Sequence, residues 1–164
     1  MTTVRDCARC SAITAKGTRC TRTTCIYPEL CFQHFRVRYG LKLAPSNLPA
    51  AGLGLFTTRP ISRNRKIADY TGDIWSDDDW AEDPSDYGIQ YDENHTLDAR
   101  STQSAIGRYA NECRTADKRA GRCRGNNSQL RTTRQNKVVL ETRGSRIPAN
   151  TEIFASYGRM YWQR

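Results

Sequence analysis

The sequence has no long hydrophobic run and no stretch in which helical periodicity is sustained over three turns. A helix that spans a bilayer needs ~20 mostly apolar residues, and nothing in these 164 residues approaches that length. The first six residues, Met-Thr-Thr-Val-Arg-Asp, also lack the apolar core of a signal peptide. We therefore expect a soluble, intracellular protein that does not enter a membrane. The length is that of one compact domain with a small satellite at most.

Because helical periodicity is missing, the predicted elements are short strands. Brief apolar or alternating runs, separated by Gly, Pro, Asn and Asp, are typical of strands joined by irregular turns. Four such runs occur, at 53–57, 66–70, 137–142 and 152–156. The sequence therefore predicts a mostly β fold.

Basic residues are absent from one part of the chain. Residues 69–98 contain 11 acidic residues and no Lys or Arg, whereas residues 1–68 hold 12 basic and 2 acidic residues and residues 99–146 hold 12 and 3. An acidic segment of this kind is either a solvated loop or one wall of a groove for a basic peptide. The flanking basic blocks could approach an anionic partner such as nucleic acid. The net charge of +9 therefore does not describe a uniformly basic nucleic-acid binder.

Cysteine is present in an odd number, seven, so a closed set of disulfides cannot use all of it. In a reducing compartment, metal binding is the expected use. Five cysteines and one of the two histidines cluster near the N-terminus: Cys7, Cys10, Cys20, Cys25, Cys31 and His34. The density of the cluster predicts a metal site, with buried, unligated thiols as the alternative.

Part of this cluster resembles a small zinc-binding motif, Cys-x3-Thr-x2-Gly-x2-Cys followed by Cys-x2-His. Cys10, Cys20, Cys31 and His34 are then the expected ligands of a structural Zn²⁺, with Gly17 in a tight turn between the first two. Four protein ligands leave no open position for a water molecule, which argues against catalysis by the metal. Cys7 and Cys25 fall outside the motif, although Cys7-x-x-Cys10 could itself form a knuckle, so an exchange of Cys7 for Cys10 stays open.

These observations divide the chain into three parts. Residues 1–36 are expected to form a zinc-binding module that folds only with its metal. Residues 37–46, followed closely by prolines and small residues, are expected to form a linker. Residues 47–164 are expected to form the main domain.

Five segments of the main domain occur in a familiar order: Ala51-Gly52-Leu53-Gly54-Leu55-Phe56, Ile67-Ala68-Asp69-Tyr70-Thr71-Gly72, Leu97-Asp98-Ala99, Arg108-Tyr109-Ala110-Asn111 and Glu152-Ile153-Phe154-Ala155-Ser156-Tyr157-Gly158. Together they resemble the SET domain of protein lysine methyltransferases over about residues 46–162. The resemblance implies a β-clip fold with several short sheets and a C-terminal pseudoknot. It also implies that S-adenosylmethionine is the cofactor and donates a methyl group to a lysine.

The resemblance assigns roles to single residues. Tyr157 and Tyr70 are the implied catalytic residues: the phenol of Tyr157 lies beside the transferred methyl group, and Tyr70 lines the lysine channel. The residues implied to bind the cofactor are Gly52, Leu53, Gly54, Arg108, Asn111, Glu112, Tyr157 and Trp162.

Two departures from the family pattern stand out. Glu112 follows Asn111 where the family usually has histidine, and no cysteine follows Cys123, so the cysteine-rich zinc segment after many SET domains is missing. Tyr161 and Trp162 are the candidate replacements for that lid.

The acidic segment falls where the family carries a variable insert beside the peptide groove. Asp77, Asp78, Asp79 and Tyr87 are therefore the predicted contacts of a basic peptide, by family analogy a histone tail, and a nuclear or chromatin-associated location is expected. A non-histone target is an open alternative. A second alternative is a catalytically inactive SET fold that binds chromatin or nucleic acid, including nucleosomal DNA, through the basic blocks.

Overall fold

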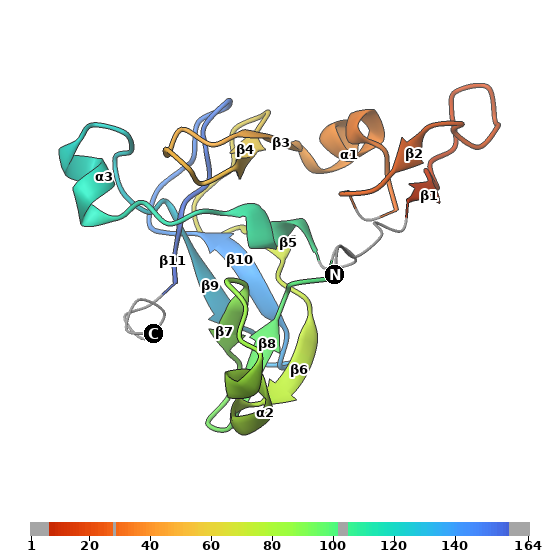
Figure 1. Cartoon of the computed structure of the whole chain (residues 1–164). Helices are drawn as coiled ribbons and strands as arrows, with labels where there is room; N and C mark the ends of the chain where they lie inside the picture. The colour runs from red at the N-terminus through yellow and green to blue at the C-terminus, as the bar shows by residue number, and fades with distance from the viewer. Residues whose placement is uncertain (1–6, 28, 102–104, 158–164) are drawn as a thin grey trace.

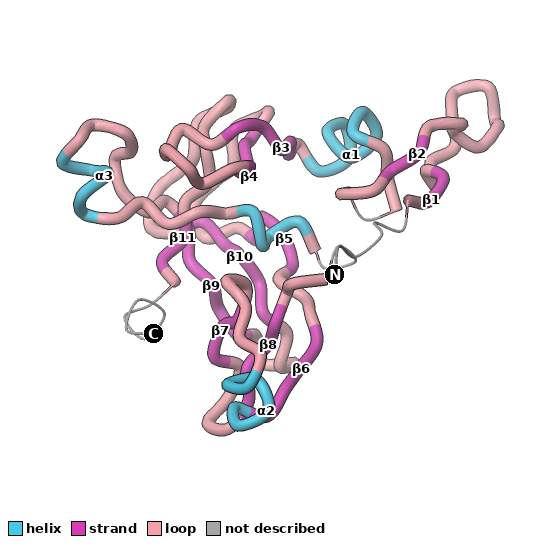
Figure 2. The backbone as a smooth tube through the Cα atoms, viewed as in Figure 1, coloured by secondary structure: helices cyan, strands magenta, loops and turns pink. Residues whose placement is uncertain are grey.

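The computed structural model describes residues 7–27, 29–101 and 105–157, and it confirms the prediction of a mostly β protein (Figure 2). Small sheets carry most of the regular structure, and the longest helix has eight residues. Within the described ranges, none of the helices has the length and apolar character that crossing a membrane requires.

The N-terminal module contains a two-stranded sheet and one helix (Figure 1). Strands β1 (Ala8–Arg9) and β2 (Thr23–Thr24) pair antiparallel, and helix α1 (Phe32–Tyr39) follows. The helix ends at Gly40, whose φ of 68° is the left-handed conformation that glycine adopts without a Cβ penalty. The next strand can therefore begin immediately after the helix.

Residues 37–46 are not the linker that the sequence predicted. Residues 37–39 complete α1, and strand β3 (Leu41–Pro45) pairs antiparallel with β4 (Leu53–Thr57) along its whole length. Leu41 is fully buried, and the backbone N–H of Leu43 donates a hydrogen bond to the Tyr27 hydroxyl. The alternating leucines, Leu41 and Leu43, therefore decide the conformation of this segment more than Pro45 and the small residues do.

The central sheet has four strands in the order β11-β9-β10-β5. Its antiparallel members are β5 (Lys66–Asp69), β9 (Ser128–Thr132) and β10 (Val138–Thr142), and β11 (Ala155–Ser156) joins β9 in parallel. The strand expected at 152–156 is thus shorter than predicted. Glu152 and Phe154 form isolated bridges to Phe56 and Asn111 instead, so this segment connects three different parts of the fold.

The acidic segment folds into a separate three-stranded sheet capped by a helix. Strands β6 (Asp73–Ser76) and β7 (Gly88–Gln90) flank β8 (His95–Asp98), and helix α2 (Asp77–Glu82) follows β6. The Ser76 side chain caps α2 by accepting from the N–H of Asp79, and three aspartates in the first turn face the positive end of the helix dipole. In Figure 1 this unit lies at the end of the molecule away from β3 and β4.

One hydrophobic core joins the N-terminal module to the main body. Cys10, Cys31 and Phe35 belong to the same buried cluster as Leu140 and Ile153. The remaining elements, the 3-10 helix η1 (Ile106–Tyr109) and helix α3 (Thr115–Arg119), lie on the connection between β8 and β9. Because the module shares its core with the body, the two fold as one packed unit.

Candidate functional site

The four predicted metal ligands come together. The sulfur atoms of Cys10, Cys20 and Cys31 and a ring nitrogen of His34 all lie within 4.8 Å of one another, and the three thiols are buried. His34 Nδ1 lies 3.5 Å from Cys10 Sγ and 3.3 Å from Cys31 Sγ. Around a tetrahedral Zn²⁺ with Zn–S bonds of ~2.3 Å, ligand atoms are about 3.5–3.8 Å apart. The group could therefore hold a metal such as zinc with little rearrangement.

The chain around this group is fixed by backbone hydrogen bonds. Gly17, at φ 74°, turns the chain between Cys10 and Cys20, and its N–H donates to the carbonyl of Thr14. Two arginine side chains hold the ligand-bearing segments from outside: Arg9 Nε donates to the Cys20 carbonyl and Arg19 Nε to the Cys10 carbonyl. The ligands are thus preorganised by their neighbours.

The thiols differ in their electrostatic surroundings. Burial raises the pKa of Cys31, but N–H groups at the start of α1, those of His34 and Gln33, and hydrogen bonds with Cys10 and His34 lower that pKa to about 6. The pKa of Cys20 is raised: a hydrogen bond from the Arg22 backbone lowers it, but burial and the neighbouring Cys10 and Cys31 thiols act in the opposite direction. A divalent cation would relieve this crowding of sulfur atoms, because it binds thiolates.

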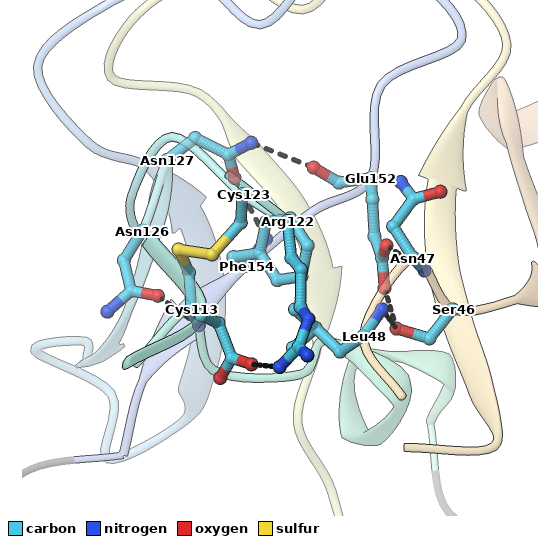
Figure 3. The surroundings of a disulfide bond; sticks show 11 residues. Ser46, Asn47, Leu48, Cys113, Arg122, Cys123, Asn126, Asn127, Glu152 and Phe154 are labelled. Carbon is cyan, nitrogen blue, oxygen red and sulfur yellow. Dashed lines mark hydrogen bonds and ion pairs between the residues drawn. A yellow bond between two sulfur atoms is a disulfide. The ribbon is translucent and has the colours of Figure 1, made fainter. Parts of the chain in front are cut away.

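Cys7 and Cys25 are not ligands. The register of β1 and β2 places Ala8 opposite Thr24, so Cys7 and Cys25 are the next pair across the two strands, and they form a disulfide. This excludes the exchange of Cys7 for Cys10 that the sequence left open. A second disulfide joins Cys113 to Cys123 (Figure 3), so metal binding, the expected use of cysteine, can account for three of the seven cysteines, and two disulfides take up the other four.

A polar cavity of about 640 Å³ collects residues that are far apart in the sequence. Gly52 and Leu53 enter it from the start of β4, and Arg108, Asn111 and Glu112 from η1 and the segment after it. It is also lined by Tyr157, which is predicted both to bind the cofactor and to act in catalysis, and by Tyr87, a predicted peptide contact. Six of the eight predicted cofactor-binding residues therefore line one cavity, which we call the first cavity.

Asn111 ties the walls of the first cavity to each other. Its Nδ2 donates to the Leu53 carbonyl over 3.1 Å and, more weakly, to Glu152 Oε1 over 3.4 Å. Glu112, next in the chain, accepts from the Ser156 hydroxyl. The Asn111 amide and the Glu112 carboxylate thus connect β4, the segment after η1 and β11 at the edge of the first cavity.

Tyr157 and Arg108 occupy the same cavity in different ways. The Tyr157 hydroxyl donates to the Ala110 carbonyl over 2.8 Å. Arg108 packs its guanidinium between the rings of Tyr87 and Tyr109, 4.7 and 4.9 Å from their centroids, and its Nη1 donates to the carbonyls of residues 99–101. Arg108 therefore holds the wall of the cavity together.

Gly54, predicted to bind the cofactor, does not line the first cavity. A Cβ at this position would clash with the carboxylate of Glu152, which is buried at 2% exposure. That carboxylate accepts from the Ser46 hydroxyl and from the Asn47 N–H, so it anchors the loop between β3 and β4. The buried Glu152 carboxylate therefore requires a glycine at position 54. The sequence analysis missed the role of Glu152, although a single acidic residue in an apolar strand was a signal that could have revealed it. Trp162 lies outside the described residues.

Tyr70 lies in a different place from Tyr157. It is buried and lines a second cavity of about 690 Å³ between the central and three-stranded sheets, together with Tyr91 and Val138. Its hydroxyl donates to the carbonyl of Tyr87, a residue of the first cavity. The structure thus places the two predicted catalytic tyrosines in different cavities, with the Tyr70 hydroxyl bonded to the backbone of a residue that lines the cavity of Tyr157.

The predicted peptide contacts also separate. Asp77 accepts from Thr96 and Gln90, and Asp79 accepts from Ser76, so both stabilise the three-stranded unit, while Asp78 is exposed. None of these three aspartates lines the first cavity. Of the acidic segment, Asp86 and Tyr87 line it.

Asp98 is the buried centre of the same unit. It accepts from Trp80 Nε1, from the Ser85 hydroxyl and from Arg100, and none of its side chain is exposed. Burial raises the pKa of Asp98, but the hydrogen bonds from Arg100, Ser85 and Trp80 outweigh it and hold that pKa below its ordinary value. The carboxylate is therefore charged at neutral pH and fixes the sheet against α2.

A search against protein-family models finds no match to this chain, and a search of curated proteins finds no significant match.

Proposed function

We propose that this protein is a protein-lysine N-methyltransferase with a SET-type main domain and S-adenosylmethionine as cofactor. The observation that carries the proposal is the first cavity. Segments around Gly52, Asn111 and Tyr157, which the sequence relates to the SET domain in that order, line one space of about 640 Å³. Cavities that hold small organic ligands measure ~300–1,000 Å³.

The chemistry of the lining suits the proposed cofactor. S-adenosylmethionine carries a sulfonium, an ammonium and a carboxylate beside an adenine ring. The cavity offers carboxylates of Asp86, Glu112 and Asp117, the guanidinium of Arg114 and the ring of Tyr157. Aromatic faces and carboxylates attract the cationic groups, whereas an arginine attracts the carboxylate. The residues present therefore fit the group.

The path of the C-terminal segment supports the SET-type topology. The N–H of Ala155 donates to the Asn111 carbonyl, and the Asn127 side chain bridges the Glu152 carbonyl and the Phe154 N–H. The segment thus passes between two earlier parts of the chain, as expected of the pseudoknot.

Methyl transfer to an amine is an in-line displacement, so the protein has to align two groups and exclude water. The bound cofactor would supply the electrophilic methyl group. Tyr157 and Asn111 would hold its methionine end, and the buried Tyr70 would orient the incoming amine. An apolar, aromatic channel also lowers the pKa of a lysine from its ordinary ~10.4, which favours the neutral, nucleophilic amine.

The proposed substrate is a lysine in a basic segment such as a histone tail. Residues 69–98 hold 11 acidic residues without a Lys or Arg, and Asp78 and Glu82 are exposed on α2. Such a unit attracts basic peptides and repels acidic ones. A nuclear or chromatin-associated location belongs to the same proposal.

The test is methyl transfer from radiolabelled S-adenosylmethionine to mixed core histones, with mass spectrometry to identify the modified lysine. Tyr157→Phe should reduce labelling by about 10²-fold or more, because alignment is most of the catalysis. Tyr39→Phe is the control: this tyrosine lies at the end of α1 and lines neither the first nor the second cavity. If neither histones nor a whole lysate become labelled while the cofactor is bound, the proposal is wrong.

A second candidate function, an inactive SET fold that binds chromatin or nucleic acid, is favoured by one observation. Glu112, in place of the family's usual histidine, is held by Ser156 at the edge of the first cavity. Titration of the cofactor separates the two candidates, because the inactive fold should give no heat of binding.

A further inference from the structure

A third cavity, of about 550 Å³, is lined by Cys123 of the Cys113–Cys123 disulfide. Four arginines also line it: Arg122, Arg124, Arg143 and Arg146. Figure 3 shows Arg122 and Cys123 beside Asn126 and Asn127 in this region. The arginines come from two segments separated in the sequence. They are brought together because the Arg143 N–H donates to the Asn127 carbonyl, and a turn at Gly144 then leads to Arg146.

Three of these guanidinium groups have no counter-charge. Arg122 pairs with Asp117, but Arg124, Arg143 and Arg146 are exposed, and within the described residues their side chains make no ion pair and no hydrogen bond. The one carboxylate among the residues that line the cavity belongs to Glu152, which already accepts from Ser46 and Asn47. Like charges gathered around one hollow raise the positive potential there, and this potential attracts an anion.

We propose that this cavity binds the phosphate backbone of a nucleic acid. Guanidinium groups hold phosphate oxygens through two parallel hydrogen bonds, which makes arginine the preferred residue for phosphodiesters. The arginines stand on an exposed rim, whereas a pocket for a small phosphate compound encloses about 70–90% of its ligand. An exposed row of guanidinium groups instead suits a polymer that carries a phosphate at every nucleotide.

The basic character continues beyond the cavity. Helix α3 and its surroundings add Arg114, Lys118 and Arg119, all three of which are exposed. The Cys113–Cys123 disulfide closes the loop that carries α3, so these cations stay beside the cavity. The basic residues thus extend from the cavity onto the loop that carries α3. It is separate from the acidic unit around α2, so the same molecule could hold a basic peptide and a nucleic acid at different places.

The test is the binding of a fluorescein-labelled DNA duplex, followed by anisotropy without S-adenosylmethionine over a series of salt concentrations. The triple variant Arg124→Gln/Arg143→Gln/Arg146→Gln should bind about tenfold or more weakly. The slope of log affinity against log salt should fall by about 1 for each arginine that contacts a phosphate. The matched control, Lys16→Gln/Arg36→Gln/Arg134→Gln, removes the same charge outside the cavity and should lose less than about threefold.

Several results would overturn the proposal: no duplex binding by the natural protein at low salt, or equal losses in the two triple variants. Arginine-dependent binding of pyrophosphate without binding of the duplex would assign the cavity to a small phosphate compound instead. Displacement of the duplex by polyglutamate at matched charge would assign it to an acidic protein segment. Far-UV circular dichroism checks that both variants fold, and single Arg143→Gln and Arg146→Gln variants replace the triple variant if it does not. Because no cofactor is present, the result is independent of the proposed methyl transfer.

Discussion

At the scale of single residues, one buried carboxylate explains a glycine that the sequence motif alone misassigns. Gly54 belongs to a glycine pair that the resemblance relates to the cofactor, but the carboxylate of Glu152 occupies the space of its missing Cβ. Gly52, by contrast, has a φ of 67° and lines the first cavity. A motif in the sequence shows that two glycines are needed, whereas only the packing shows that they are needed for different reasons.

Asp98 gives a prediction about pH. Its folded-state pKa lies below the unfolded value of ~3.9, so the carboxylate contributes stability above that pH, and this contribution is lost as the pH falls through the folded pKa. Asp98→Asn should lower the free energy of unfolding at neutral pH by about 1.5–3 kcal/mol, because hydrogen bonds to a charged acceptor are lost. The variant should also depend less on pH below about 4. Urea unfolding between neutral and acidic pH measures both effects.

The control for that experiment is Asp78→Asn, an exposed aspartate in the same unit. It should change the stability by less than about 0.5 kcal/mol. A loss in Asp98→Asn that does not shrink toward acidic pH would show that the stabilisation comes from packing and not from the charge.

At the scale of elements, those specified by residues close together in the sequence could be predicted, and those that depend on remote segments could not. The strands β4, β5 and β10 were predicted because local apolar patterns of four or five residues specify them. The metal group was predicted for the same reason, because its four ligands lie within 25 consecutive residues, from Cys10 to His34. Strand β3 was missed, since Pro45, Pro49 and the small residues near them are typical of a connector, and only pairing with β4 orders the strand.

Elements that depend on remote partners could not be predicted. Strands β1 and β2 have two residues each, too few for a pattern, and their pairing decides that Cys7 joins Cys25. The Cys113–Cys123 disulfide requires the loop around α3 to close on itself, which the sequence does not reveal. The arginine-lined cavity depends in the same way on a contact between Asn127 and Arg143.

The N-terminal module gives a prediction about metal removal. The protein should carry about one zinc per chain, and removal of the zinc by a chelator should destabilise residues 7–36, because the four ligands hold this module together. Hydrogen exchange followed by mass spectrometry should show faster exchange there, with little change in β9 and β10. Since Phe35 and the thiols share a core with Leu140, we also expect a lower melting temperature of the whole chain.

Matched variants make the metal prediction specific. Cys20→Ser should lose the zinc, whereas Cys7→Ser/Cys25→Ser, which removes the disulfide beside it, should keep about one zinc per chain. Equal zinc contents in the two variants would contradict the assignment of the ligands.

At the scale of the whole molecule, acidic and basic residues are gathered in different places. The acidic unit with α2 and the arginine-lined cavity are built from different parts of the chain, and the first cavity is lined by residues of both signs, Asp86 and Glu112 with Arg108 and Arg114. The net charge of +9 therefore combines an acidic unit that we propose attracts a basic peptide, an arginine-lined cavity proposed for phosphates and a cavity of mixed charge proposed for the cofactor. Composition alone could not reveal this separation, because it depends on how the segments are folded together.

The central claim is that the first cavity binds S-adenosylmethionine, and isothermal titration calorimetry tests it most directly. The account predicts a saturable heat with one cofactor per chain, and competition by S-adenosylhomocysteine, which shares every group of the cofactor except the methyl. Full occupancy of the zinc group should be verified in the same sample, so that a negative result cannot come from an unfolded module. The absence of any heat of binding from folded, zinc-loaded protein would contradict the account.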